Sequence, residues 1–292
     1  VADGSASTEV RQLLCLLGAS LMSFAKASTA SRKLLGLPIS EAYIRRLCYS
    51  QGRRVGLKLA TVKPGQDLVG SCDGTMVNTT QHGWKELKAY QFKYGEHKHG
   101  RACLESCDRF APRLRLAAVA MNAGDAEQLF GGSGAAGGDE RGGNRELPMA
   151  IRIIGIWPAW GQVHEASRGG DPNGPPKARA WANRYCADLE DYGGRVLWRR
   201  LRHAKYCDPE RQSAVDALRG YLRKNSERLD YPTYKDNGWP VSSGPMESFC
   251  KQLGQRLKGP GMRWSTRNID PMATLVSLWT NEEWDTHWKP VA

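Results

Sequence analysis

The chain has 292 residues, 40% of them hydrophobic and 25% charged, which suffices for one large domain or two modest ones around a real core. Its formal charge of +12 favours a polyanionic partner; a merely basic globular protein is the alternative. The apolar stretch Leu13–Leu21 is too short to span a bilayer, and no cationic segment precedes it as in a signal peptide. These features argue against a membrane protein and against a secreted one.

The cysteines indicate a reducing compartment. All eight are scattered without a CxxC pair, as expected of free thiols, so we expect a cytoplasmic location. One group, His97-x-His99-x₃-Cys103-x₃-Cys107, has the residue types that zinc accepts, although its spacing is not a recognised signature.

The first 63 residues are predicted to form a helical domain that resembles a helix-turn-helix. Apolar residues in Thr8–Ala30 recur at helical spacing, and Ser31–Gly36 and Ser40–Ser50 follow as two short helices, with Ser40 as N-cap. In the last helix an apolar face points inward and Arg45 and Arg46 point outward. Contact with DNA is one interpretation, and an ordinary helical bundle packed on the next domain is the other.

Residues 64–292 are predicted to form a second, α/β domain that starts after Pro64-Gly65. Strands are expected at Asp67–Asp73, Lys85–Tyr94 and Ile151–Trp157, and a helix at Arg109–Met121. The seven glycines of Gly131–Gly143 predict a mobile insert that contributes no ligand. Later helices are expected at Ala178–Leu189, Ser213–Leu229 and Met272–Trp288, and the tryptophans of the last one should pack in the core.

Two short motifs contain carboxylates that suit metal-dependent chemistry on phosphodiesters. They are Cys72-Asp73-Gly74-Thr75-Met76-Val77-Asn78-Thr79 and Ser242-Ser243-Gly244-Pro245-Met246-Glu247. The second begins a helix whose apolar stripe leaves Glu247 at its edge, pointing toward the core without being buried. Taken alone, Asp73-Gly74 also fits a hairpin turn, and Glu247 fits an i,i+4 salt bridge with Lys251.

Two basic runs predict contacts with phosphates. Arg195–Lys205 and Lys251–Arg267 each hold five basic residues and no acid. Neutralising phosphates releases counterions, so binding should weaken steeply with salt. The DNA-binding residues expected from these runs and from the N-terminal helices are Arg45, Arg46, Arg199, Arg200, Lys251, Arg256, Lys258 and Arg263.

These two motifs, with Gln255-Arg256-Leu257-Lys258-Gly259-Pro260-Gly261-Met262-Arg263-Trp264, resemble insertion-sequence transposases of the DDE type, closest to the Kra-type group and distantly mutator-like. The resemblance covers most of the chain and is strongest in Tyr231–Trp264. It implies an RNase H-like core, in which Asp73 and Glu247 are catalytic and bind Mg²⁺ or Mn²⁺. The implied partner is double-stranded DNA at element ends, with a homo-oligomer compatible and no membrane.

The middle carboxylate of the family pattern is missing. The regions where it is expected read Leu129-Phe130-Gly131-Gly132-Ser133-Gly134-Ala135-Ala136 and Ile153-Ile154-Gly155-Ile156-Trp157-Pro158-Ala159-Trp160. Asp125 and Asp139 are nearby acids without a matching context. We therefore predict a transposase with weak or absent catalysis; the alternatives are a non-catalytic DNA-binding protein derived from a transposase, and a nuclease or resolvase on the same core.

Overall fold

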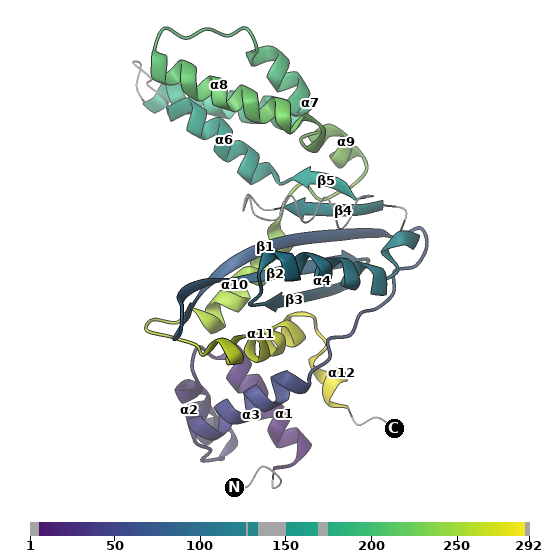
Figure 1. Cartoon of the computed structure of the whole chain (residues 1–292), viewed down its shortest axis with the longest axis vertical. Coiled ribbons are helices and arrows are strands. Elements are labelled where there is room, and N and C mark those ends of the chain that lie inside the picture. Colours follow the sequence, from purple (N-terminus) through teal and green to yellow (C-terminus); the bar gives the residue numbers. More distant parts are fainter. Residues whose placement is uncertain (1–5, 127, 134–149, 169–174, 290–292) are drawn as a thin grey trace. The chain divides into compact units, whose positions relative to one another are not determined.

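The protein is a mixed α/β structure that divides into two compact units, seen in a computed structural model that describes residues 6–126, 128–133, 150–168 and 175–289 (Figure 1). Unit 1 consists of Val1–Gln128, Gly138–Pro148 and Gly244–Ala292, and unit 2 of Leu129–Gly137 and Met149–Ser243. The N-terminal helices predicted as a domain of their own therefore lie in the same unit as the first three strands and the C-terminal helices. In the described residues no helix combines the length and apolarity needed to cross a bilayer.

Three helices begin the chain, and a serine caps each of them. Helices α1 (Thr8–Ser20), α2 (Phe24–Leu35) and α3 (Glu41–Arg54) follow Ser7, Ser23 and Ser40, and each serine hydroxyl accepts a backbone N–H three residues on, at 3.4, 3.1 and 3.3 Å. The single helical stretch expected over residues 8–30 is wrong, because the chain leaves the helix at 21–23 and is capped anew. Helix α3 packs on α1, α2 and α11, and its arginines 45 and 46 are exposed as predicted.

The strands of unit 1 form an antiparallel meander, β1 (Asp67–Thr79), β2 (Gly83–Tyr94) and β3 (His97–Cys103). Strand β1 does not end at Asp73 as expected; it continues for six more residues, so Asp73 lies mid-strand opposite Ala89. The reason is that Asp73-Gly74 is paired within the ladder, and the hairpin turn lies instead at residues 80–82. The hairpin interpretation of Asp73-Gly74 is therefore wrong.

Helices cover both faces of this sheet. Leu87, Ala89 and Ala102 share the face that packs on α10 (Gly244–Leu257) and α11 (Thr266–Thr280). On the opposite face, the Tyr90 ring lies 6.1 Å from that of Phe110 in α4 (Cys107–Ala120). The short α12 (Trp284–Trp288) ends the described chain. Side chains alternate between the two faces of β2, and both faces are buried because a helical layer lies on each.

Unit 2 is mostly helical and contains one parallel strand pair, β4 (Gln128–Ser133, of which Gln128 belongs to unit 1) with β5 (Ile151–Ile154). Its helices are α6 (Ile156–Arg168), α7 (Pro175–Leu201), α8 (Pro209–Lys224) and α9 (Tyr231–Asp236), with short 3₁₀ turns at Ala123–Asp125 in unit 1 and Ser226–Arg228 in unit 2. The strand expected over 151–157 stops early because α6 begins at Ile156. Residues 131–133 pair in β4, contrary to the mobile insert expected there, and residues 134–143 lie outside the described part.

Candidate functional site

Asp73 lies on the face of β1 that meets α10. Its Oδ1 accepts the backbone N–H of Gly74 at 2.8 Å, and its side chain is half-buried. The Cys250 thiol of α10 lies beside this carboxylate: burial, together with the negative charge of Asp73, raises the pKa of Cys250 to about 12. The Cys250 turn of α10 therefore lies over the middle of β1.

Gly74 leaves room for the side chain of Glu86 on the opposite face of the sheet. A Cβ at this position would lie 2.3 Å from Oε1 of Glu86, whose other oxygen holds the buried ammonium of Lys88 at 2.5 Å. The glycine therefore admits an ion pair beneath the strand. This packing explains the Asp-Gly sequence without a metal, although it leaves the carboxylate of Asp73 on the α10 side.

Glu247 lies in the first turn of α10, three residues before Cys250, and is exposed. Met246, Phe249, Cys250, Leu253 and Leu257 are buried, so the predicted apolar stripe of this helix is confirmed. Residues three apart on a helix are neighbours on one face, about 5–6 Å between Cβ atoms. The turn that carries Glu247 is therefore adjacent to the turn that contacts Asp73. Among the ion pairs of described residues, none joins Glu247 to Lys251.

A third carboxylate for this pair is not found in the described part of the chain. No group of three or more His, Cys, Asp or Glu side chains suitable for a metal ion occurs among the described residues. Asp125 ends a 3₁₀ turn, and Asp139 lies outside the described residues. Gly155 precedes α6, where a Cβ would meet Pro158 at 3.5 Å. Asp73 and Glu247 are hard oxygen donors of the kind Mg²⁺ prefers, but two carboxylates do not complete the ligand set that a two-metal site needs.

Most of the basic residues predicted to bind DNA are exposed to solvent, in both runs. Lys251 and Lys258 are exposed on α10 and just beyond it, and Arg263 is exposed on the loop that follows. In unit 2, Arg199 and Arg200 are exposed near the end of α7, and Arg200 forms an ion pair with Asp188. In unit 1, the exposed basic residues of the second run therefore start at Lys251, one turn after Glu247, and continue past the end of α10.

Arg256 is the exception, because its side chain is enclosed in the core of unit 1 with 2% exposure. Its Nε donates to the carbonyl of Gly18 at 2.6 Å, and its guanidinium carbon lies 4.5 Å from the Phe24 ring centroid and 5.0 Å from that of Trp264. Burial lowers the pKa of Arg256 to about 10. The expectation that Arg256 contacts phosphates is therefore wrong: two aromatic rings and a backbone carbonyl hold this arginine of the basic run inside the core.

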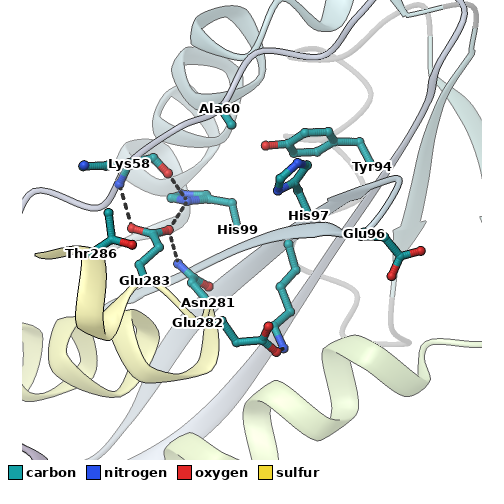
Figure 2. A pocket seen from close by; sticks show the side chains of 11 residues that line it. Lys58, Ala60, Tyr94, Glu96, His97, His99, Asn281, Glu282, Glu283 and Thr286 are labelled. Carbon is teal, nitrogen blue, oxygen red and sulfur yellow. Dashed lines mark hydrogen bonds and ion pairs between the residues drawn. The ribbon is translucent and has the colours of Figure 1, made fainter.

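A separate cavity of about 290 Å³ lies between the loop before β1, strand β3 and the α11–α12 corner (Figure 2). His99 at its wall is buried; its Nδ1 lies 3.1 Å from the Lys58 carbonyl oxygen and 3.8 Å from Glu283, and its Nε2 lies 3.5 Å from the Tyr90 hydroxyl. Both ring nitrogens therefore face protein groups, so zinc ligation by His99 is not supported. The sequence did not indicate this cavity, since its lining comes from three distant segments.

Glu283 makes most of the polar contacts around His99. It accepts the backbone N–H of Lys58 at 3.0 Å and the side-chain amide of Asn281 at 3.2 Å, while Asn281 also brackets the backbone of Gly100. The network fastens the extended segment before β1 to the sheet and to the end of α11. The polar groups of Glu283, His99 and Asn281 are engaged by other protein groups, which indicates a structural role.

We predict that Glu283→Gln lowers the free energy of unfolding at pH 7 by about 2 kcal/mol, because buried partners lose a charged acceptor. Burial alone would raise the pKa of Glu283, but hydrogen bonds from His99 and from the Lys58 backbone hold it below its ordinary value of 4.5. A lowered folded pKa means that this stability is complete above the unfolded pKa and is lost as the pH falls through the folded value.

Urea unfolding at pH 7 and at pH 3 measures this effect, and the difference between the two proteins should shrink at pH 3. Glu282→Gln is the matched control, since the neighbouring Glu282 pairs with Lys98 while its side chain is 79% exposed. Equal losses in both variants, or a difference that grows in acid, would contradict the role assigned to Glu283.

No protein-family model and no curated protein matches the chain. The Asp73–Glu247 pair, the basic residues near it and the motifs that contain them are therefore the basis for a functional proposal.

Proposed function

We propose that the chain is a DNA-binding protein of the transposase type, which binds element-end DNA through unit 1 and whose metal-dependent cleavage is weak or absent. The observation that carries the proposal is the position of Asp73 on the middle of β1, against the Cys250 turn of α10 and one turn from Glu247. The helix that carries one motif thus packs on the strand that carries the other, although the motifs are 174 residues apart in the chain.

The order of elements in unit 1 also supports the RNase H-like core that the resemblance implies. Three antiparallel strands are followed by helix α4, and a later helix returns to pack on the face of β1 that carries Asp73. In such a core, a carboxylate on the first strand and a carboxylate on the returning helix belong to one site.

The basic surface that adjoins this site supports binding to duplex DNA. Lys251, Lys258 and Arg263 are exposed, and they follow Glu247 along α10 and its loop. Phosphates are recognised by such charges without regard to base sequence, and each phosphate that is neutralised steepens the salt dependence. Non-catalytic DNA binding would use the same surface, so the two candidate functions share this property and differ in cleavage.

We predict that replacing Lys251, Lys258 and Arg263 together by alanine weakens duplex binding at least tenfold at low salt. The slope of log affinity against log salt concentration should fall by about 0.9 for each phosphate that the variant no longer neutralises. Fluorescence anisotropy with a labelled duplex measures both quantities. The control variant removes the same charge from exposed lysines elsewhere in unit 1, Lys33, Lys63 and Lys93. Equal effects of the two triple substitutions would show that net charge alone matters and would contradict a defined surface.

Cleavage is tested separately with supercoiled plasmid DNA in Mg²⁺ or Mn²⁺. With Asp73 and Glu247 as the only assigned acids, we expect little or no nicking above background, because two metals need more ligands than these supply. Robust nicking that is abolished by Asp73→Asn and Glu247→Gln, but not by Asp67→Asn at the exposed start of the same strand, would establish an active transposase or nuclease instead.

A further inference from the structure

An aromatic stripe runs along helix α7 in unit 2. Trp181, Tyr185 and Tyr192 lie on one helical face together with Asp188, since their spacings of four, three and four residues follow the helix period. The rings of Trp181 and Tyr185 meet edge to face, with centroids 4.5 Å apart. Neither carboxylate motif includes these residues.

A kink in α7 brings an arginine back onto this stripe. In a straight helix, Asp188 and Arg200 would be about 18 Å apart along the axis. The backbone turns at Gly193, with φ 75° and ψ 170°, and Gly194 donates its N–H to the carbonyl of Leu229 at 2.8 Å. Arg200 thereby forms an ion pair with Asp188, and its guanidinium carbon lies 4.6 Å from the Tyr192 ring centroid.

Two more guanidinium groups lie over the other rings. Arg211, from α8, lies 5.7 Å from the centroid of Trp181 and 4.9 Å from that of Tyr206. Arg184 lies 5.8 Å from the centroid of Tyr185. The Trp181 indole N–H donates to the Tyr206 hydroxyl at 3.1 Å, which orients both rings. Together these residues form an arginine–aromatic strip, defined as Trp181, Arg184, Tyr185, Tyr192, Arg200, Tyr206 and Arg211.

The strip is open to solvent at one end, where Tyr192 lies between the acids Asp188, Glu190 and Asp191 before it and a basic segment after it; Asp188 and Glu190 are paired with Arg200 and Lys235. Tyr192 is 52% exposed and the Arg200 side chain 41%. The adjoining segment 195–205 carries five basic residues and no acid. The exposed part of Tyr192 and the basic residues of segment 195–205 face solvent and are open to a ligand. A ligand with both flat rings and regular negative charge would use all of these groups.

We propose that the arginine–aromatic strip binds single-stranded DNA. Unpaired bases stack on aromatic rings and on guanidinium planes, and the phosphates between them pair with exposed arginines of segment 195–205 such as Arg199 and Arg202, whereas Arg200 is held by Asp188. In a duplex the base faces are occupied by neighbouring bases, so the rings of the strip would have nothing to stack on. The inference goes beyond the duplex-binding surface of unit 1 and does not depend on Asp73, Glu247 or α10.

The test measures the affinity of the whole chain for labelled oligo(dT) and for a duplex of equal length. Tyr192→Ala should weaken oligo(dT) binding about tenfold, the loss expected when one base–aromatic stack is removed, and should leave duplex binding unchanged. Tyr192→Phe, which keeps the ring, should retain wild-type affinity. Trp157→Ala is the matched control: Trp157 is 64% exposed in the same unit, and no arginine of the described residues stacks on its ring.

Circular dichroism melting verifies that each variant is folded, and Arg184→Gln provides a second variant should Tyr192→Ala unfold. Unchanged oligo(dT) affinity in a folded Tyr192→Ala or Arg184→Gln protein would overturn the proposal, as would an equal loss with Trp157→Ala. Tighter binding of oligo(rU) than of oligo(dT) would overturn the assignment to DNA. The triple alanine variant of unit 1 should still bind oligo(dT), so failure of one surface is distinguishable from failure of the other.

Discussion

Substitution of Gly52 by alanine is expected to lower the free energy of unfolding of unit 1 by about 3 kcal/mol, the upper range for inserting one methyl group into a close-packed contact. Helix α3 crosses α11 at this glycine. A Cβ at position 52 would lie 2.1 Å from the carbonyl oxygen of Pro271 and 2.7 Å from its carbonyl carbon. These atoms are backbone in the buried part of α11, so the two helices would have to move apart to relieve the clash.

Urea unfolding, followed by far-UV circular dichroism, measures the change in stability. Gly254→Ala is the control, because Gly254 also lies inside a helix of unit 1 and the nearest atom to its Cβ is the flexible side chain of Lys258 at 3.6 Å. With room for the methyl group, this variant should gain about 0.5–1 kcal/mol from the lower helix propensity of glycine. A Gly52→Ala protein as stable as wild type would mean that α3 does not pack on α11 this closely.

Replacing Arg256 by alanine should cost about 3–5 kcal/mol, because it removes a large buried side chain and the partner of two aromatic rings. The guanidinium connects α10 to the carbonyl of Gly18 at the end of α1 and to Phe24 at the start of α2. It also lies under Trp264, whose backbone N–H bonds to Asn78 of β1 at 2.9 Å. The substitution therefore loosens the contact between α10, the N-terminal helices and the sheet.

The companion variant Arg256→Met separates packing from charge. Methionine refills most of the volume, and the Nη2 of Arg256 has no hydrogen-bond partner among the described residues, so this variant should lose less than half as much stability. Its duplex affinity and salt slope should equal those of the wild type, since a buried side chain does not reach phosphates. A stable Arg256→Ala protein with a reduced salt slope would instead restore Arg256 to the DNA-binding surface.

The Arg256 contacts bear on the candidate site, because they set where α10 lies on the sheet. Arg256 anchors the last turn of this helix, and Cys250 lies against Asp73 near its middle. Glu247 lies in the first turn of the same helix, one turn from Cys250. Weakening this anchor should shift α10 on the sheet without altering either carboxylate, so a loss of DNA binding in an Arg256 variant can arise from lost stability.

Local patterns in the sequence determined much of this protein. Helical spacing located α1 and, with the Ser40 cap, α3, whereas the break that separates α1 from α2 was missed; alternation located β2, and the apolar stripe of α10 was predicted with Glu247 at its edge. These features depend on neighbours within about four positions, where side-chain periodicity and capping act. The carboxylates 73 and 247 were likewise found from short motifs, as were the two basic runs.

Only the tertiary structure decided how far the strands extend, which side chains are buried and which distant residues meet. The length of β1 depends on pairing with β2, so the position of Asp73 in the middle of a strand could not be read from residues 67–73 alone. In sequence, Arg256 cannot be distinguished from the exposed basic residues beside it. In the folded chain it is buried against the rings of Trp264 and of Phe24, which is far away in the sequence. The arginine–aromatic strip exists because a kink at Gly193 returns Arg200 to Asp188. In each case the outcome depends on contacts formed in the folded chain, whose free energy local periodicity does not reveal.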